Sequence, residues 1–218
     1  MVKKLQALKA KKGFTLVELI VVIAIIGVLA AILVPTMLGM VTKSRVTSAN
    51  STASGIKDTV NAFIVSQDTN GKGIKRSSTA YGIDISVSAG TVSVLVDSNL
   101  MGSNIDAETY QSALADEIKD QYTLKDASAK VYIKNGQVVG VVYYAGDSMD
   151  GMTIPSVANC EAGGFAWSGS KDSQVGVTDD GDILGTYPQL AYDEDQEGEE
   201  WAAADGDASE ENSENSDG

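Results

Sequence analysis

The longest predominantly apolar run of the chain extends from Phe14 to Val41 and contains one charged residue, Glu18. As a helix at 1.5 Å per residue it would be about 42 Å long. That is enough to cross a hydrocarbon layer about 30 Å thick. The run therefore predicts a transmembrane helix.

After residue 41 the apolar run gives way to a stripe of apolar residues spaced by three and four, which is one face of a helix. The stripe consists of Val46, Ala49, Ala53, Ile56, Val60, Phe63 and Ile64. We therefore expect the apolar helix to continue as an amphipathic helix to about Gln67, where Asn70-Gly71-Lys72-Gly73 ends it. A rod of about 80 Å with an apolar first half suits the subunit of a polymer.

Beyond the long helix, alternation and capping signals predict both strands and a second helix. Residues 83–88 alternate apolar and polar side chains, as a half-buried strand does. Residues 91–96 fit either a strand or the start of a helix. Asp106 is a plausible N-cap for a helix over residues 107–122.

The clearest local signal is Asn135-Gly136 between two β-rich runs, which predicts a hairpin with positive φ at both turn residues. Its second strand is apolar on both faces and should lie centrally in a sheet. Residues 146–192 are loop-rich, with short strand candidates at 164–167, 173–178 and 183–187. Together these elements predict an α+β fold, in which the long N-terminal helix packs on an antiparallel sheet.

A basic leader precedes the apolar run. Residues 1–12 carry five lysines and no acid, which favours a cytoplasmic leader by the positive-inside rule. An ordinary secretory signal is cut after its apolar region, whereas the polar break here, ending in Gly13, comes before it. Cleavage at this break would keep the apolar helix in the mature protein.

The segment from Lys12 to Leu19, Lys-Gly-Phe-Thr-Leu-Val-Glu-Leu, resembles the cleavage and methylation motif of type IV prepilins and their relatives, the type II secretion pseudopilins and competence pilins. The resemblance covers roughly residues 9 to 41. It implies that a membrane prepilin peptidase cuts after Gly13 and methylates the new amino group of Phe14.

Glu18 is the residue of the motif with the most specific implied role. A carboxylate within an apolar helix is costly and usually functional, although near a helix end it can also reach the interface. The resemblance implies that Glu18 pairs with the freed Phe14 amine of a neighbouring subunit. Such a pair would set the register of subunits in an apolar filament core, where an unpaired charge is strongly disfavoured.

Gly27 and Pro35 also stand where this family commonly has them. Pro35 removes one intrahelical hydrogen bond and clashes with the carbonyl of Ala31, so the helix should kink or loosen there. Gly27 weakens the helix further. Both residue types are tolerated in any membrane helix, whereas the resemblance implies local melting between them during extraction from membrane to filament.

The charge of the chain is strongly acidic and unevenly distributed. Removal of the leader leaves eleven basic residues against thirty acidic ones, a net charge of −19. Residues 193–218 hold twelve acids and no Lys or Arg, which predicts a disordered acidic tail. Because such a charge repels nucleic acid backbones, we expect no direct nucleic acid binding.

The residue types that carry most catalysis are sparse. The chain has no histidine, and Cys160 is its single cysteine, so no intrachain disulfide can form. Cys160 fits a buried small hydrophobe, with an intersubunit bridge as the alternative. No nucleophile has a base beside it, so we expect no enzyme.

One turn offers a candidate metal site. Asp179, Asp180 and Asp182 lie around Gly181, and calcium favours such hard oxygen ligands. Asp-Gly turns are common without metal, however, and the EF-hand spacing is absent. The main expectation is therefore no metal and no cofactor, with calcium as a weak candidate.

These observations divide the chain into a leader removed from residues 1–13, a transmembrane and polymerisation helix at 14–41, a head at 42–192 and an acidic tail at 193–218. We interpret it as a prepilin, first a single-pass protein of the inner (cytoplasmic) membrane and then a subunit of an extracellular pilus supporting adhesion or motility. Its expected partners are other pilin subunits, the prepilin peptidase and the assembly platform. The alternatives are a pseudopilin of a type II secretion or competence system, and an anchored surface domain that binds a ligand without polymerising.

Overall fold

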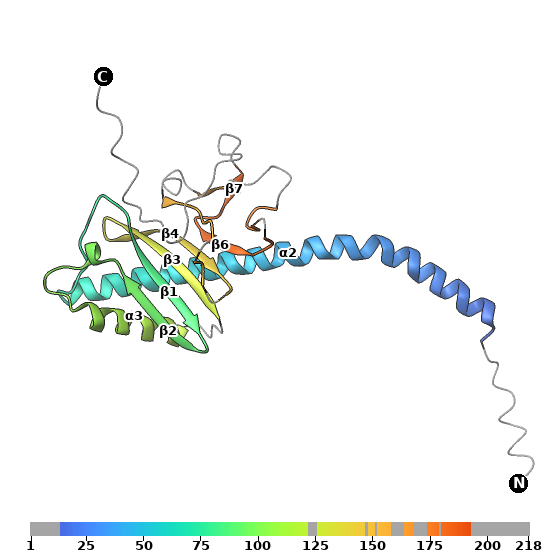
Figure 1. Cartoon of the computed structure of the whole chain (residues 1–218), viewed down its shortest axis with the longest axis horizontal. Helices are drawn as coiled ribbons and strands as arrows, with labels where there is room; N and C mark the ends of the chain where they lie inside the picture. Colours follow the sequence, from blue (N-terminus) through green and yellow to red (C-terminus); the bar gives the residue numbers. More distant parts are fainter. Residues whose placement is uncertain are drawn as a thin grey trace, which may run out of the picture. The chain divides into compact units, whose positions relative to one another are not determined.

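The computed structural model describes residues 14–121, 126–146, 148–150, 152–157, 164–167, 174–178 and 180–192. The chain divides into two compact units, one up to Ser44 and the other from Arg45 onward. One helix, α2 (Leu16–Thr69), contributes to both units. Figure 1 labels the elements.

In the first unit, α2 is helical throughout, and the helix runs through Pro35 without a break. The hydroxyl of Thr36 donates a hydrogen bond to the carbonyl of Leu33 at 2.8 Å, beside the position where Pro35 lacks an N–H to donate. The predicted apolar helix is confirmed, while its melting around Pro35 stays a prediction.

In the second unit, α2 buries the predicted stripe from Ala49 to Ile64. Val46, the first residue of the predicted stripe, is only half-buried. The helix ends at Thr69, close to the expected Gln67, and Gly71 follows with φ of +72°. That left-handed conformation favours glycine and is a common way to end a helix.

The second unit contains a five-stranded antiparallel sheet with the strand order β2-β1-β3-β4-β6. Its strands are β1 (Tyr81–Ser88), β2 (Thr91–Val96), β3 (Ala127–Lys134), β4 (Gln137–Tyr144) and β6 (Leu184–Tyr187). The sheet and α2 confirm the predicted α+β fold. Residues 91–96, which fitted either element, form a strand, and the short 3-10 helix η2 (Ser98–Leu100) follows it.

The hairpin prediction is confirmed in detail. Asn135 and Gly136 have φ values of +54° and +79°, and they connect Lys134 of β3 to its partner Gln137 of β4. Strand β4 lies between β3 and β6, as its two apolar faces predicted.

The second helix, α3 (Ala107–Gln121), follows Asp106 as predicted. The carboxylate of Asp106 accepts hydrogen bonds from the backbone N–H of Thr109 at 2.9 Å and from the Thr109 hydroxyl. These bonds lower the pKa of Asp106, as expected for an N-cap carboxylate. Tyr110 of α3 packs edge-on against Phe63 of α2, with ring centroids 5.0 Å apart.

The sheet carries a core on each face. The larger core lies between the sheet and the two helices, and includes Ile56 of α2, Leu114 of α3 and Val131 of β3. A smaller core on the other face packs Phe165 and Ile154 against Val142 of β4 and Tyr132 of β3. The long helix and the sheet therefore stabilise each other through a single large apolar interface.

The C-terminal segment matches the prediction in part. Residues 184–187 form β6, as expected, and 166–167 form β5 (Ala166–Trp167). Within 173–178 the described residues contribute only an isolated bridge between Val177 and Ile183. Strand β7 (Ala191–Tyr192), which pairs in parallel with β5, was not predicted.

Three close contacts fix the sheet on α2. The side-chain oxygen of Asn61 accepts the N–H of Val138 at 2.9 Å, and that of Asn50 accepts the N–H of Thr186 at 2.8 Å. Next to Thr186, a Cβ on Gly185 would lie 2.2 Å from the backbone of Ala49. Strand β6 therefore crosses α2 at a distance that only glycine permits.

We predict that Gly185→Ala lowers the free energy of unfolding by about 3 kcal/mol, because the helix and the strand must move apart. The control is Gly82→Ala in β1, where the nearest atom to the added Cβ is Lys130 Cε at 3.6 Å. That change should cost less than about 0.5 kcal/mol. Urea unfolding of the full chain in detergent, followed by circular dichroism, measures both; equal losses would contradict the close crossing.

Candidate functional site: the exposed part of the long helix

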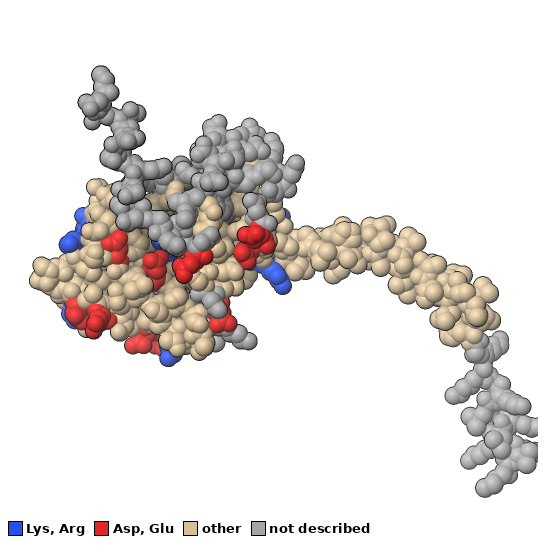
Figure 2. Space-filling view, in the orientation of Figure 1, with Lys and Arg blue, Asp and Glu red and all other residues tan. Residues whose placement is uncertain are grey.

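The first unit presents an apolar helical surface that the described chain does not cover. Every residue from Phe14 to Val41 is exposed, and large apolar side chains such as Phe14 and Met40 are 87% and 73% exposed. Figure 2 shows this stretch of α2 as a tan surface without visible Lys or Arg. The helix is long and apolar enough to cross a membrane. A surface of this kind requires lipid or other protein as its surroundings.

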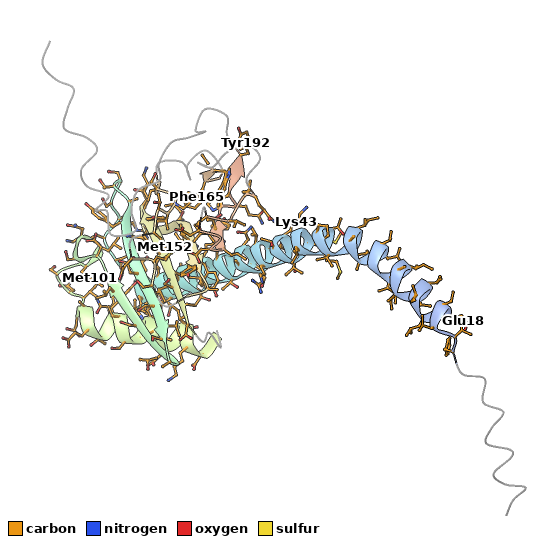
Figure 3. All side chains as sticks on the ribbon, turned by 45° about the vertical axis from the view of Figure 1, so that its right-hand side comes forward. Glu18, Lys43, Met101, Met152, Phe165 and Tyr192 are labelled. Atoms are coloured by element: carbon orange, nitrogen blue, oxygen red, sulfur yellow. The ribbon has the colours of Figure 1, made fainter. Side chains whose placement is uncertain are left out.

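Glu18 is the only charged residue of this stretch, and Figure 3 shows it at the N-terminal end of α2. Its Oε2 accepts hydrogen bonds from the N–H of Thr15 at 2.8 Å and from the Thr15 hydroxyl at 2.7 Å. In return the N–H of Glu18 donates to the hydroxyl of Thr15 at 3.2 Å. This reciprocal pattern is a capping box, in which N-cap Thr15 and Glu18 satisfy the free N–H groups of the first turn.

The capping box places the carboxylate at the N-terminal end of α2, next to Phe14. Both bonds from Thr15 end on Oε2, so Oε1 can still accept a bond from a donor outside the described residues. Sequence reasoning assigned Glu18 an intersubunit role and missed Thr15. The spacing Thr-x-x-Glu ahead of an apolar run was the signal that identifies it.

The two helix-weakening residues lie on the same exposed surface. A Cβ built on Gly27 meets nothing within 4 Å in the described chain. Packing among the described residues therefore does not require glycine at this position. The helix-weakening role proposed for Gly27 and Pro35 stays untested by this geometry.

The remaining candidate residues belong to the second unit or lie outside the described residues. Asp182 Oδ1 accepts a hydrogen bond from the Tyr144 hydroxyl at 3.2 Å, and Gly181 turns the chain with φ of +87°. Asp179 lies outside the described residues, as do Gly13, Cys160 and the acidic tail. The calcium candidate of Asp179, Asp180 and Asp182, the cleavage site and the tail therefore stay predictions.

We predict that Thr15→Ala frays the first turn of α2, since the hydroxyl that accepts from the N–H of Glu18 is lost. Exchange of that amide in detergent micelles should become roughly fivefold faster. Thr15→Ser keeps the hydroxyl and should exchange like the parent. Unchanged protection in Thr15→Ala would show that the capping box does not order the turn.

Comparison with known proteins finds similarity in the N-terminal part of the chain, which includes the exposed helix. Residues 8–34 match the family model of the prokaryotic N-terminal methylation motif. The chain is 45% identical over 58 residues to a fimbrial protein of Pseudomonas aeruginosa, which covers 27% of this chain and 38% of that relative. It is 38% identical over 96 residues to fimbrial protein Q of Moraxella bovis. These residues are 44% of this chain and 59% of that relative. No solved structure gives a significant match.

A further relative is the type IV major pilin protein PilE of Neisseria gonorrhoeae, 31% identical over 103 residues, which are 44% of this chain and 62% of that protein. The chain thus spans less than two thirds of the length of these relatives. The motif match includes Phe14, Thr15 and Glu18, the residues that begin the exposed helix. The N-terminal segment of this chain carries the prokaryotic N-terminal methylation motif, and the chain is similar to part of proteins named fimbrial proteins and a type IV major pilin.

Proposed function

We propose that this chain is a structural subunit of an extracellular type IV pilus. It is made as a membrane-anchored precursor, cut after Gly13 by a prepilin peptidase and methylated on the amino group of Phe14. An assembly platform in the membrane then transfers it into a filament held together by the first part of α2. The filament supports adhesion or motility.

One observation carries this proposal: an exposed apolar helix with a single carboxylate in its first turn begins inside a methylation motif. The apolar surface suits both a bilayer and a bundle of like helices, so the same residues serve before and after assembly. Relatives named fimbrial proteins and type IV pilins support the filament. A helix that only anchors the protein in a membrane would need the apolar surface, but neither the carboxylate nor the methylation motif.

The proposed assembly contact is an ion pair between Glu18 and the Phe14 amine of a neighbouring subunit. Cleavage creates this amine, so the pair forms only in the processed protein. Inside an apolar filament core each charge would be disfavoured without the other. The pair thereby selects subunits that are both processed and correctly aligned.

We predict that Glu18→Gln prevents assembly although it keeps the cap. The glutamine side-chain oxygen can accept the Thr15 N–H as glutamate does, but it leaves the Phe14 amine without a counter-charge. In cells that make the peptidase and the platform, filament yield in sheared fractions should fall at least roughly tenfold, while N-terminal processing continues.

Glu18→Ala and Thr15→Ala complete this experiment. Glu18→Ala loses both the cap and the charge and should fail as Glu18→Gln does. Thr15→Ala loses the cap and keeps the charge, and should retain most assembly. Filament yield near the parent level in Glu18→Gln would refute the charge pair and leave capping as the role of Glu18.

We also propose that α2 melts locally between Gly27 and Pro35 when the subunit leaves the membrane. Pro35 leaves one carbonyl of the preceding turn without its usual N–H partner. Gly27 costs the helix about 1 kcal/mol relative to alanine. In assembled filaments, amides between these residues should exchange faster than those of residues 19–26, and Pro35→Ala should reduce the difference. Equal protection of the two segments would contradict melting.

The rival functions differ in what the same experiments show. A pseudopilin or competence pilin would share the processing and the Glu18 dependence, but its deletion would abolish protein secretion or DNA uptake. An anchored binding domain would yield no filaments, and Glu18→Gln would leave its amount at the surface unchanged.

A further inference from the structure

Asparagine is directly followed by glycine at two positions of the chain, Asn70-Gly71 and Asn135-Gly136. Such a pair reacts spontaneously in water, because glycine has no side chain that would hinder the attack of its backbone nitrogen on the asparagine side chain. Both asparagines are exposed, so access of water does not distinguish them. They differ in the conformation of their turns and in the contacts that keep these turns closed.

The reaction joins the backbone nitrogen of the glycine to the side-chain carbonyl carbon of the asparagine. This nitrogen gives its proton to water, the new C–N bond closes a succinimide ring, and the side-chain amide leaves as ammonia. Water then adds to one of the two ring carbonyls and opens the ring. The products are aspartate and isoaspartate. In isoaspartate the backbone runs through the former side chain and is one methylene longer.

The turn at Asn135 opposes ring closure. Asn135 and Gly136 have φ values of +54° and +79°, as a two-residue hairpin turn requires. At the ψ of about +47° that accompanies such a φ, the Cβ of Asn135 and the nitrogen of Gly136 lie almost opposite each other across the Cα–C bond. The ring can therefore close only after the turn has been lost.

The neighbouring strands and α2 keep this turn closed. The N–H of Asn135 donates to the carbonyl of Ser77 at 2.7 Å. Close to the turn, Ile133 of β3 is opposite Val138 of β4, and both side chains are buried in the larger core. The side-chain oxygen of Asn61 on α2 accepts the N–H of Val138 at 2.9 Å. Opening the turn at Asn135 consequently disturbs the core of the head.

Asn70 lies instead at the end of α2. The N–H of Gly71 donates to the carbonyl of Asp68 at 3.1 Å, and the N–H of Lys72 donates to the carbonyl of Gln67 at 2.9 Å. Together with the φ of +72° at Gly71, these two bonds form a Schellman motif, in which Asn70 is the C-cap of the helix. Asn70 itself does not have a positive φ, so it lacks the conformation that opposes ring closure at the hairpin.

Few contacts hold this last turn of α2. Residues 68–72 are all exposed, and the exposed ion pair between Asp68 and Arg76 adds little stability. The N–H of Asn70 is divided between two carbonyls of the preceding turn, at 3.1 and 3.3 Å. Helix ends open locally at a much lower free energy than core strands. An open turn releases the nitrogen of Gly71 from Asp68 and allows it to reach the side chain of Asn70.

We propose that Asn70 is a site of spontaneous deamidation to aspartate and isoaspartate, and that the hairpin keeps Asn135 intact. Isoaspartate lengthens the backbone between residues 70 and 71, so the two bonds of the Schellman motif no longer fit together. Either product also adds a negative charge at the C-terminal end of α2, where the helix dipole disfavours it. The last turn of the long helix therefore loosens as the protein ages.

Incubation of the full chain in detergent, at mildly alkaline pH and in water enriched in oxygen-18, tests this proposal. The heavy oxygen enters during ring opening, and digestion for peptide mass spectrometry follows in ordinary water. We expect label at residue 70 to accumulate at least roughly tenfold faster than at residue 135, because the two turns open at different free energies. Equal rates at the two sites, or a faster reaction at Asn135, would overturn the proposal.

The same chain in concentrated urea controls for the local sequence. Unfolding removes both turns, so the two sites should react at rates within about twofold of each other. A preference for Asn70 that persists unchanged in urea would have its cause in the neighbouring residues. That result would overturn the protection of Asn135 by the fold.

Asn70→Gln is the matched variant for the effect on the helix. Glutamine keeps the side-chain amide, but the larger ring that it would have to close forms far more slowly. After equal incubation, the amide of Lys72 should exchange at least roughly threefold faster in the parent than in Asn70→Gln, because the Schellman bond of this amide is lost. Before incubation the two should exchange alike.

Equal exchange after extensive conversion of Asn70 would show that deamidation leaves the last turn intact, and would overturn the proposed loosening. These measurements require neither filaments nor a peptidase. They can therefore fail or succeed independently of the proposed pilus.

Discussion

An apolar helical surface that the described residues of its own chain do not cover is the constraint on which the rest of the structure depends. From Phe14 to Val41 the described chain offers this surface no partner. Its surroundings must be lipid or like helices, because water would meet a continuous apolar face. Helical geometry is equally necessary, since only a helix satisfies its own backbone groups in an apolar medium. The first part of α2 therefore restricts the protein to surroundings of lipid or of like helices.

The same helix organises the head. After Ser44 its apolar side chains narrow to a single stripe, and the sheet is built on that stripe. Asn50 and Asn61 bind backbone N–H groups of β6 and β4, and Gly185 lets β6 approach the helix backbone. Polar side chains and a glycine thus fix the sheet at defined points, while the apolar stripe supplies most of the driving force. The helix α2 therefore has an apolar first part suited to lipid or like helices, and a second part that packs on the sheet of the head.

The elements with strong periodicity could be predicted from the sequence. The elements and contacts that depend on residues distant in the chain could not. The stripe of α2, the cap at Asp106 and the Asn135-Gly136 turn are local signals, and each appears in the structure. Strand β7 has two residues and depends on pairing with β5, so its own sequence carries no signal. The role of Asn50 depends on a partner 136 residues away. In the site, Glu18 was identified as a lone charge, but its bond to Thr15 required attention to the capping pattern rather than to charge alone.

We propose that cleavage after Gly13 converts an anchored precursor into a polymer subunit. The most direct measurement is mass spectrometry of the intact chain and of its N-terminal peptide, made on material sheared from the cell surface. We expect an abundant chain that begins at methylated Phe14. A chain that still begins at Met1 and occurs only in membranes would contradict it.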